Sequence, residues 1–190
     1  MGLQFLGGSS WAEVTREERF FCSRLYELIR PSPREFVGYI NRSVPLNLPT
    51  EADWEAAFEV CFYRDLWHHR GRRGRPVSEK RTFDLCLFSD VAIVVIEGKA
   101  YQGFDGGQLR LFEKEREWIR RETSVDRVVL TAIISSHYTP RKQTEDVFDG
   151  ILRWADVSRF FHEDTVLLRA DEIYQLKATA TRGAATANAP

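Results

Sequence analysis

Residues 83–99 have the sequence FDLCLFSDVAIVVIEGK, and this stretch decides the fold. Two apolar runs, rich in β-branched and aromatic residues, lie on either side of Ser89 and Asp90. The pattern predicts two buried strands, at 81–88 and 91–99, because such side chains pack well on a pleated surface. The two polar residues between the runs predict a tight hairpin turn.

Three charged residues stand out against these apolar runs. Side chains alternate along a strand, so Glu97 and Lys99 share a face. With a two-residue turn, paired residue numbers sum to 179, which places Asp84 opposite Val95 and diagonal to Glu97, with Cβ atoms roughly 7 Å apart. Any even shift of the register keeps the three charges on one face. The sequence therefore predicts two carboxylates and a lysine gathered on one side of the sheet.

The alternative to a functional site is that these three charges form ordinary cross-strand ion pairs. Two features favour a functional site. Glu97 and Lys99 end an almost unbroken apolar run, where an unpaired charge is costly. Two carboxylates beside a lysine also suit phosphodiester hydrolysis, because carboxylates bind Mg²⁺ and an ammonium stabilises charge on a phosphate.

The rest of the chain predicts an α/β protein, from apolar residues at helical spacing and from further β-rich runs. The expected elements are helices at 11–30 and 34–42, a strand at 58–67, the two hairpin strands, a helix at 105–121, a strand at 127–135, and helices at 155–162 and 170–177. A strand–helix–strand crossover makes strands 91–99 and 127–135 parallel. Residues 135–138, Ser-Ser-His-Tyr, should then emerge beside Lys99.

This order of elements, with Asp84 on one strand and Glu97 and Lys99 on the next, resembles the PD-(D/E)XK nuclease superfamily. The resemblance covers residues 11 to 137 as an αβββαβ core. Phe83 replaces the proline of the family motif, a position that varies widely among members. The resemblance implies a restriction-endonuclease-like fold, in which helices flank a mixed central sheet, with extra helices at both ends of this chain.

The same resemblance implies a metal-dependent nuclease that hydrolyses DNA with Mg²⁺, for which Mn²⁺ can substitute. Asp84, Glu97 and the carbonyl of Gly98 would bind the metal. Lys99 would orient or deprotonate the attacking water, or stabilise charge on the phosphate. DNA versus RNA, endo versus exo cleavage and the recognised sequence stay open.

Two further family features have counterparts here. Many members have a glutamate on the first helix that reaches the metal, and Glu18 lies in the apolar stripe of the predicted first helix. A capping box with Thr15 is an equal alternative for Glu18, and Glu17 is the fallback for the metal. An exonuclease-like branch has Gln-x-x-x-Tyr after Glu-x-Lys. Gln108 matches it, with Phe112 in place of the tyrosine. Gln108 is therefore expected to support the site by positioning Lys99 or water, and a solvated residue of the helix is the alternative.

A basic segment follows the strand predicted at 58–67. His68 and His69 are adjacent, so they are expected in a loop or at DNA rather than on one metal ion. Four arginines without an acid among them suit sequence-independent phosphate contacts, and a solvated loop is an equal alternative. These arginines are Arg70, Arg72, Arg73 and Arg75.

The composition is that of one globular domain. The chain has 190 residues, of which 43% are hydrophobic and 29% charged, and its net charge of −1 argues mildly against extensive nucleic-acid coating. The three cysteines are far apart in apolar stretches, which predicts reduced thiols in a cytoplasmic protein. No apolar run reaches the roughly 20 residues that span a bilayer, so no membrane partner is expected. We expect one domain at 1–177 and a disordered tail at 178–190.

Two other functions remain open at this stage. The chain could be a non-catalytic module on the same fold that binds nucleic acid or protein. It could also be a subunit of a larger assembly, such as a defence or mobile-element system, since one small domain leaves little room for separate sequence recognition. A homodimer or a partner subunit is compatible with either.

Overall fold

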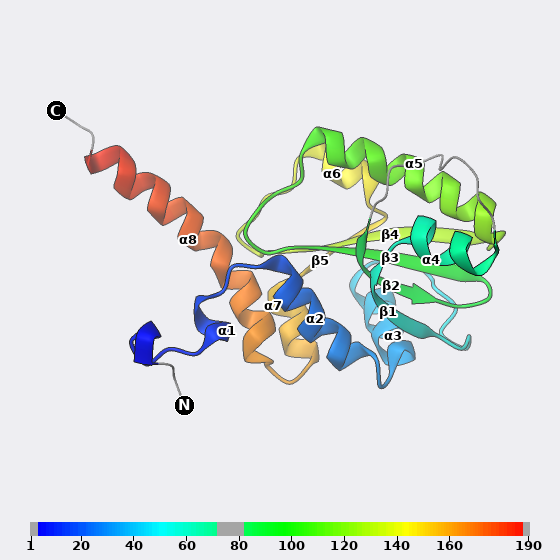
Figure 1. Ribbon diagram of the computed structural model, residues 1–190, viewed down its shortest axis with the longest axis horizontal. Helices are drawn as coiled ribbons and strands as arrows, with labels where there is room; N and C mark the ends of the chain where they lie inside the picture. Colours follow the sequence, from blue (N-terminus) through cyan, green and yellow to red (C-terminus); the bar gives the residue numbers. More distant parts are fainter. Residues whose placement is uncertain (1–3, 72–81, 188–190) are drawn as a thin grey trace.

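The structure, a computed structural model, describes residues 4–71 and 82–187, and it is an α/β fold with a mixed sheet between helices (Figure 1). The strands are β1 (Glu55–Val60), β2 (Phe83–Phe88), β3 (Ala92–Lys99), β4 (Arg127–Ile134) and β5 (Gly150–Arg153). After a 3₁₀ turn, η1 (Gln4–Leu6), the helices are α1 (Trp11–Val14), α2 (Glu18–Ile29), α3 (Pro33–Ser43), α4 (Phe62–His69), α5 (Gly106–Thr123), α6 (Lys142–Val147), α7 (Trp154–Phe160) and α8 (Thr165–Ala187).

The five strands lie in the order β1-β2-β3-β4-β5. The pairs β1–β2 and β2–β3 are antiparallel, whereas β3–β4 and β4–β5 are parallel. The parallel pairing predicted for the strand–helix–strand crossover through α5 is therefore confirmed. Lys99 pairs with Ile134, so the chain that follows β4 does emerge beside Lys99.

The hairpin between β2 and β3 has a wider turn than predicted. Leu85 pairs with Ile96, so paired numbers sum to 181 instead of 179. The turn is closed by the N–H of Ser89, which donates to the carbonyl of Ala92 at 2.9 Å. A shift of two residues leaves every side chain on its predicted face, because the side-chain repeat of a strand is two.

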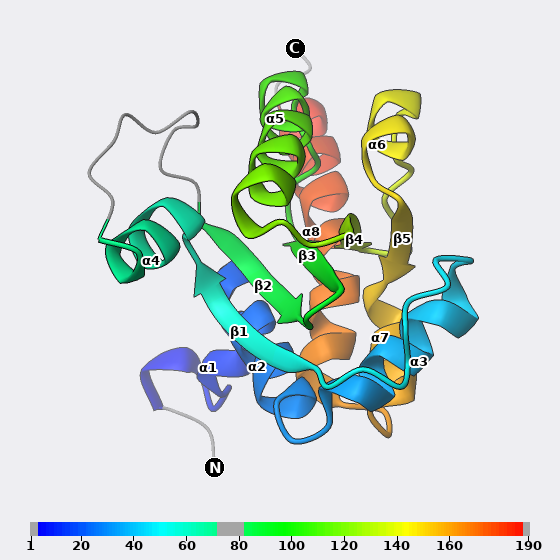
Figure 2. The same ribbon diagram turned by 90° about the vertical axis from the view of Figure 1, so that its right-hand side faces the viewer.

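Helices cover both faces of the sheet (Figure 2). Val94 and Ile96 of β3 pack in the cluster that includes residues of α2, α3, α7 and α8. Ile93 and Val95 pack in the cluster on the opposite face, under α4, α5 and α6. Since β3 is central and covered on both sides, all eight of its residues are buried, which is why it has a nearly continuous apolar sequence.

The strand predicted at 58–67 is wrong except at residues 58–60, since β1 begins at Glu55. β1 ends at Val60, and α4 begins two residues later. Glu59 adopts a positive φ of 52°, which distorts the end of the strand. Asp65 then accepts the N–H of Cys61 at 3.2 Å, as a polar side chain does near a helix start. Aromatic content alone did not distinguish this short helix from a strand.

The helix predicted at 11–30 is interrupted. The chain is extended at Thr15, so α1 and α2 are separate helices. Ser10 is the N-cap of α1, and its N–H donates to Glu13 at 2.6 Å. Trp11 and Val14 of α1 are 58% and 37% exposed. The buried stripe of the first helix therefore begins only within α2.

The second half of the chain contains elements that were not predicted. α6 and β5 are short and have no clear periodic pattern in the sequence. α8 continues to Ala187, although disorder was expected from residue 178, because its alanine-rich sequence has high helix propensity. Its C-terminal part extends away from the body of the protein (Figure 1).

No helix in the described ranges combines the length and apolar character needed to cross a membrane. Cys22, Cys61 and Cys86 are buried free thiols, as predicted.

Candidate functional site

The predicted charges meet at the C-terminal end of β3. Glu97 and Lys99 are 4% and 9% exposed, which is rare for charged side chains without partners. The Nζ atom of Lys99 lies 3.1 Å from Oε1 of Glu97 and 3.2 Å from Oε2 of Glu18. The ammonium group is thus held between two carboxylates, one from the sheet and one from α2.

Asp84 lies at the place where β2 and β3 separate. Its Oδ2 atom accepts the backbone N–H of Gly98 at 2.8 Å. The last paired residues before this point are Leu85 and Ile96, so the side chain of Asp84 takes up a strand N–H that β2 would otherwise bond with its backbone. The carboxyl group is fixed between the two strands, beside Glu97.

Gly98 is required at the centre of this site by packing on the other face. A Cβ atom there would lie 2.6 Å from Sγ of Cys22 in α2 and 2.8 Å from the ring of Trp154 in α7. The indole N–H of Trp154 also donates to the carbonyl of Lys99 at 3.1 Å. Close approach of α2 and α7 therefore sets the position of the Glu-Gly-Lys segment.

Glu18 joins the site from the N-terminal end of α2. Besides its contact with Lys99, its Oε1 atom accepts the N–H of Gln102 at 3.3 Å. It makes no capping box with Thr15, whose Oγ1 atom accepts the N–H of Glu17 at 3.3 Å instead. Of the two alternatives for Glu18, the structure has the contact with the site. Glu17, the fallback, is exposed at the N-cap of α2.

Gln108 reaches the site from the first turn of α5. Asp105 caps this helix by accepting the N–H of Gln108 at 2.8 Å. The side-chain Nε2 of Gln108 then donates to Oε1 of Glu97 at 3.1 Å. Phe112, one turn further, is fully buried in the core. The amide thus positions Glu97, whereas Lys99 was one of its expected partners.

The charges at the site shift one another's pKa. Burial raises the pKa of Asp84 to about 7, and the neighbouring Glu97 adds to the rise, while the N–H of Gly98 and the ammonium of Lys99 oppose it. Burial lowers the pKa of Lys99, but the carboxylates of Glu97, Glu18 and Asp84 outweigh it and hold that pKa above its usual range. In the metal-free protein these carboxylates therefore favour the ammonium form of Lys99, which donates hydrogen bonds.

The basic segment is only partly described. Arg70, at the C-cap of α4, donates to the carbonyl of Glu122 and lies 3.9 Å from its carboxylate. Glu122 is 14 residues from Gln108 on α5, so the two are about 21 Å apart along the helix axis. The structure does not bring Arg70 to the site. Arg72, Arg73 and Arg75 lie outside the described residues.

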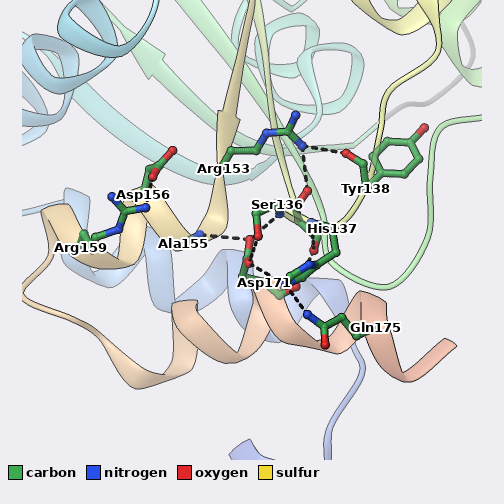
Figure 3. Close-up of polar contacts among 10 residues, drawn as sticks. Ser136, His137, Tyr138, Arg153, Ala155, Asp156, Arg159, Asp171 and Gln175 are labelled. Atoms are coloured by element: carbon green, nitrogen blue, oxygen red, sulfur yellow. Dashed lines mark hydrogen bonds and ion pairs between the residues drawn. The ribbon is translucent and has the colours of Figure 1, made fainter. Parts of the chain in front are cut away.

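A second polar cluster, centred on Asp171 of α8, lies at the end of β4 (Figure 3). Oδ1 of Asp171 accepts the N–H groups of Ser136 at 2.7 Å and Ala155 at 3.2 Å, and Oδ2 accepts the hydroxyl of Ser136. Arg153 donates to the carbonyl of Tyr138 at 2.8 Å. His137 and Asp171 are 3.8 Å apart, too far for a hydrogen bond. The hydroxyl of Ser136 thus donates to the carboxylate of Asp171, and the cluster joins α8 to β4 and α7.

Asp171 was missed by sequence reasoning because a single aspartate in a helix has no distinguishing spacing.

Among residues 4–71 and 82–187, no group of three or more His, Cys, Asp or Glu side chains is arranged to hold a metal ion. No protein-family model and no curated protein matches the chain. The functional assignment therefore depends on the geometry around Lys99.

Proposed function

We propose that this chain is a metal-dependent nuclease of the PD-(D/E)XK type that hydrolyses phosphodiester bonds of DNA. The observation that supports this most is the convergence of five side chains from four elements on one point. The five are Asp84, Glu97, Lys99, Glu18 and Gln108. An ion pair that served only stability would not need a second and third carboxylate beside one lysine, since each buried charge costs free energy.

Charge and donor chemistry fit a divalent cation. Three carboxylates face one ammonium, and the raised pKa of Asp84 reflects the unfavourable burial of its negative charge beside Glu97. Carboxylate, carbonyl and water oxygens are the ligands that Mg²⁺ prefers, and one or two carboxylates usually suffice. Asp84 and Glu97 would hold the ion. Glu18, whose oxygens bond Lys99 and the N–H of Gln102 in the metal-free protein, would exchange one of these contacts to complete the shell.

The backbone adds a further oxygen. Within a strand, the N–H and C=O of one residue point toward the same neighbouring strand. Because the N–H of Gly98 donates to Asp84, its carbonyl is directed to the same side. A bound Mg²⁺ would polarise the phosphate and lower the pKa of the attacking water.

The residues of the chain then have distinct tasks. Lys99, as a cation, stabilises the negative charge that develops on the phosphate and orients water by donating hydrogen bonds. Gln108 holds the carboxylate of Glu97 in one orientation. Trp154 and Cys22 keep water from the rear of the strand by close packing.

The test is a cleavage assay with supercoiled plasmid, linear duplex and single-stranded DNA, in Mg²⁺, in Mn²⁺ and in EDTA. Wild type should cut with either metal and not in EDTA. Lys99→Ala should lose at least about 100-fold in rate, the usual effect of removing a group that stabilises transition-state charge. Lys114→Ala, an exposed lysine on α5, is the matched control and should retain full activity.

A separate measurement addresses the metal. Mn²⁺ binding, followed by electron paramagnetic resonance of the free ion, should be weakened in Asp84→Asn and Glu97→Gln and retained in Asp90→Asn, on the exposed hairpin turn. Equal activity of Lys99→Ala and wild type would refute the nuclease. Binding of DNA without cleavage of any of these substrates would instead favour the non-catalytic module.

A further inference from the structure

The link between α1 and α2 places an arginine at the edge of the site. The guanidinium carbon of Arg16 lies over the ring of Tyr101, 5.5 Å from its centroid. Arg16 is two residues before Glu18, and Tyr101 is two residues after Lys99. Glu18 in turn bonds both Lys99 and the N–H of Gln102. The two segments are thus joined at two places, and two residues of extended chain span at most about 7 Å.

Arg16 differs from the arginines that follow it on α2. Arg19 pairs with Glu59, and Arg24 pairs with Asp164 at 2.8 Å. Within the part of the chain that the structure describes, Arg16 makes no ion pair with a carboxylate, although two glutamates follow it in the sequence. Its side chain is exposed, and its recorded partner is an aromatic ring.

This arrangement suits a phosphate ligand. An aromatic ring within about 6 Å attracts a guanidinium and restricts its position, and the N–H donors stay available to bond two phosphate oxygens at once. A DNA strand that approaches Lys99 also meets three carboxylates, so it needs positive charge nearby. Arg16 supplies that charge without contact to the metal-binding groups.

We propose that Arg16, held by Tyr101, binds a phosphate of the DNA strand next to the one that is cleaved. This inference rests on the proposed nuclease function. It makes Arg16 a substrate-binding residue that anchors the strand, while Lys99 acts at the reacting phosphate. Removal of Arg16 should therefore change KM and the salt dependence, and leave kcat nearly unchanged.

The experiment measures initial cleavage rates of a fluorescein-labelled duplex over a series of KCl concentrations. Arg16→Ala should raise KM about 10-fold at low salt, the effect of losing one hydrogen-bonded charge contact. The slope of log(kcat/KM) against log[salt] should become shallower by about 0.9, the contribution of one phosphate. Arg16→Lys should keep the slope and recover part of the KM, because it retains the charge and loses the bidentate geometry. Arg19→Ala, the matched control, should behave as wild type.

Direct binding separates KM from affinity. Fluorescence anisotropy measures the affinity of the same duplex for Lys99→Ala and for the double variant that adds Arg16→Ala. The double variant should bind about 10-fold more weakly than Lys99→Ala, and the slope of log Kd against log[salt] should change by the same amount as that of kcat/KM. Normal KM and slope in Arg16→Ala, together with an inactive Lys99→Ala, would overturn the role of Arg16 and leave the nuclease intact. A fall in kcat at unchanged KM would also overturn it. An inactive wild type would remove both proposals.

Discussion

Replacement of Asp84 by asparagine should stabilise the metal-free protein at alkaline pH while it abolishes cleavage. The pKa of Asp84 is raised from an ordinary value of 3.8 to about 7, with burial as the main cause. Between these two values the folded state binds a proton that the unfolded state has released. Folding is therefore progressively weakened as the pH rises from 4 to 7. Asparagine keeps an oxygen that can accept the N–H of Gly98 and never ionises.

The magnitude follows from the same pKa. Each unit between the two states corresponds to about 1.36 kcal/mol, so the two units from pH 5 to pH 7 set an upper limit of about 2.7 kcal/mol. Asp84 retains some solvent contact, which reduces the effect to about 1–2.5 kcal/mol. For a domain of this size, the advantage of Asp84→Asn in Tm should grow by roughly 3–8 °C from pH 5 to pH 8.

The assay is urea unfolding followed by tryptophan fluorescence, at pH 5 and pH 8 in EDTA. Asp90→Asn, an exposed aspartate on the same hairpin, is the control and should show no such pH-dependent gain. If the difference in free energy of unfolding between Asp84→Asn and wild type is the same at both pH values, the pKa of Asp84 is not raised by its burial in the folded protein. The electrostatic description of the site would then be wrong.

Three further perturbations test the supporting structure. Gly98→Ala should lower the free energy of unfolding in urea by about 1–3 kcal/mol, because its Cβ would lie 2.6 Å from Sγ of Cys22. Adding Cys22→Ala should restore part of this stability. A Gly98→Ala variant as stable as wild type would contradict the close packing. Asp171→Ala should cost about 1–3 kcal/mol and lower Tm by roughly 2–12 °C, since it removes the buried carboxylate that accepts hydrogen bonds from Ser136 and Ala155. A melting curve like that of wild type would refute it. Gln108→Leu should lower kcat about 10-fold with an unchanged melting curve, because Glu97 loses its orienting hydrogen bond. Gln108→Glu should be as slow as Gln108→Leu, because an ionised glutamate cannot donate that hydrogen bond.

Local patterns in the sequence were sufficient for the three middle strands of the sheet, β2, β3 and β4. Alternation along the two hairpin strands placed Asp84, Glu97 and Lys99 on one face, and this survived an error of two in the register because the repeat of a strand is two. The parallel arrangement of β3 and β4 followed from the helical crossover between them, which returns the chain to the same end of the sheet. These features depend on near neighbours in the chain and on general rules of strand geometry.

Other elements could not be deduced in this way. α4 has the aromatic composition of a strand, and only Glu59 with its positive φ and the contact of Asp65 with Cys61 separate it from β1. α6 and β5 are too short to show a period. α8 runs beyond residue 177 because alanine favours helix, although the low complexity of the segment suggested disorder.

The sequence by itself determined which face of the hairpin holds the charges, because strand alternation is a local property of the backbone. Tertiary structure alone decided that Glu18, 81 positions away, reaches Lys99, and that Asp171 joins three elements at the end of β4. Such contacts depend on how helices pack against the sheet. Packing is set by the shapes of many side chains together, such as Gly98 against Cys22 and Trp154, and no single stretch of sequence contains that information.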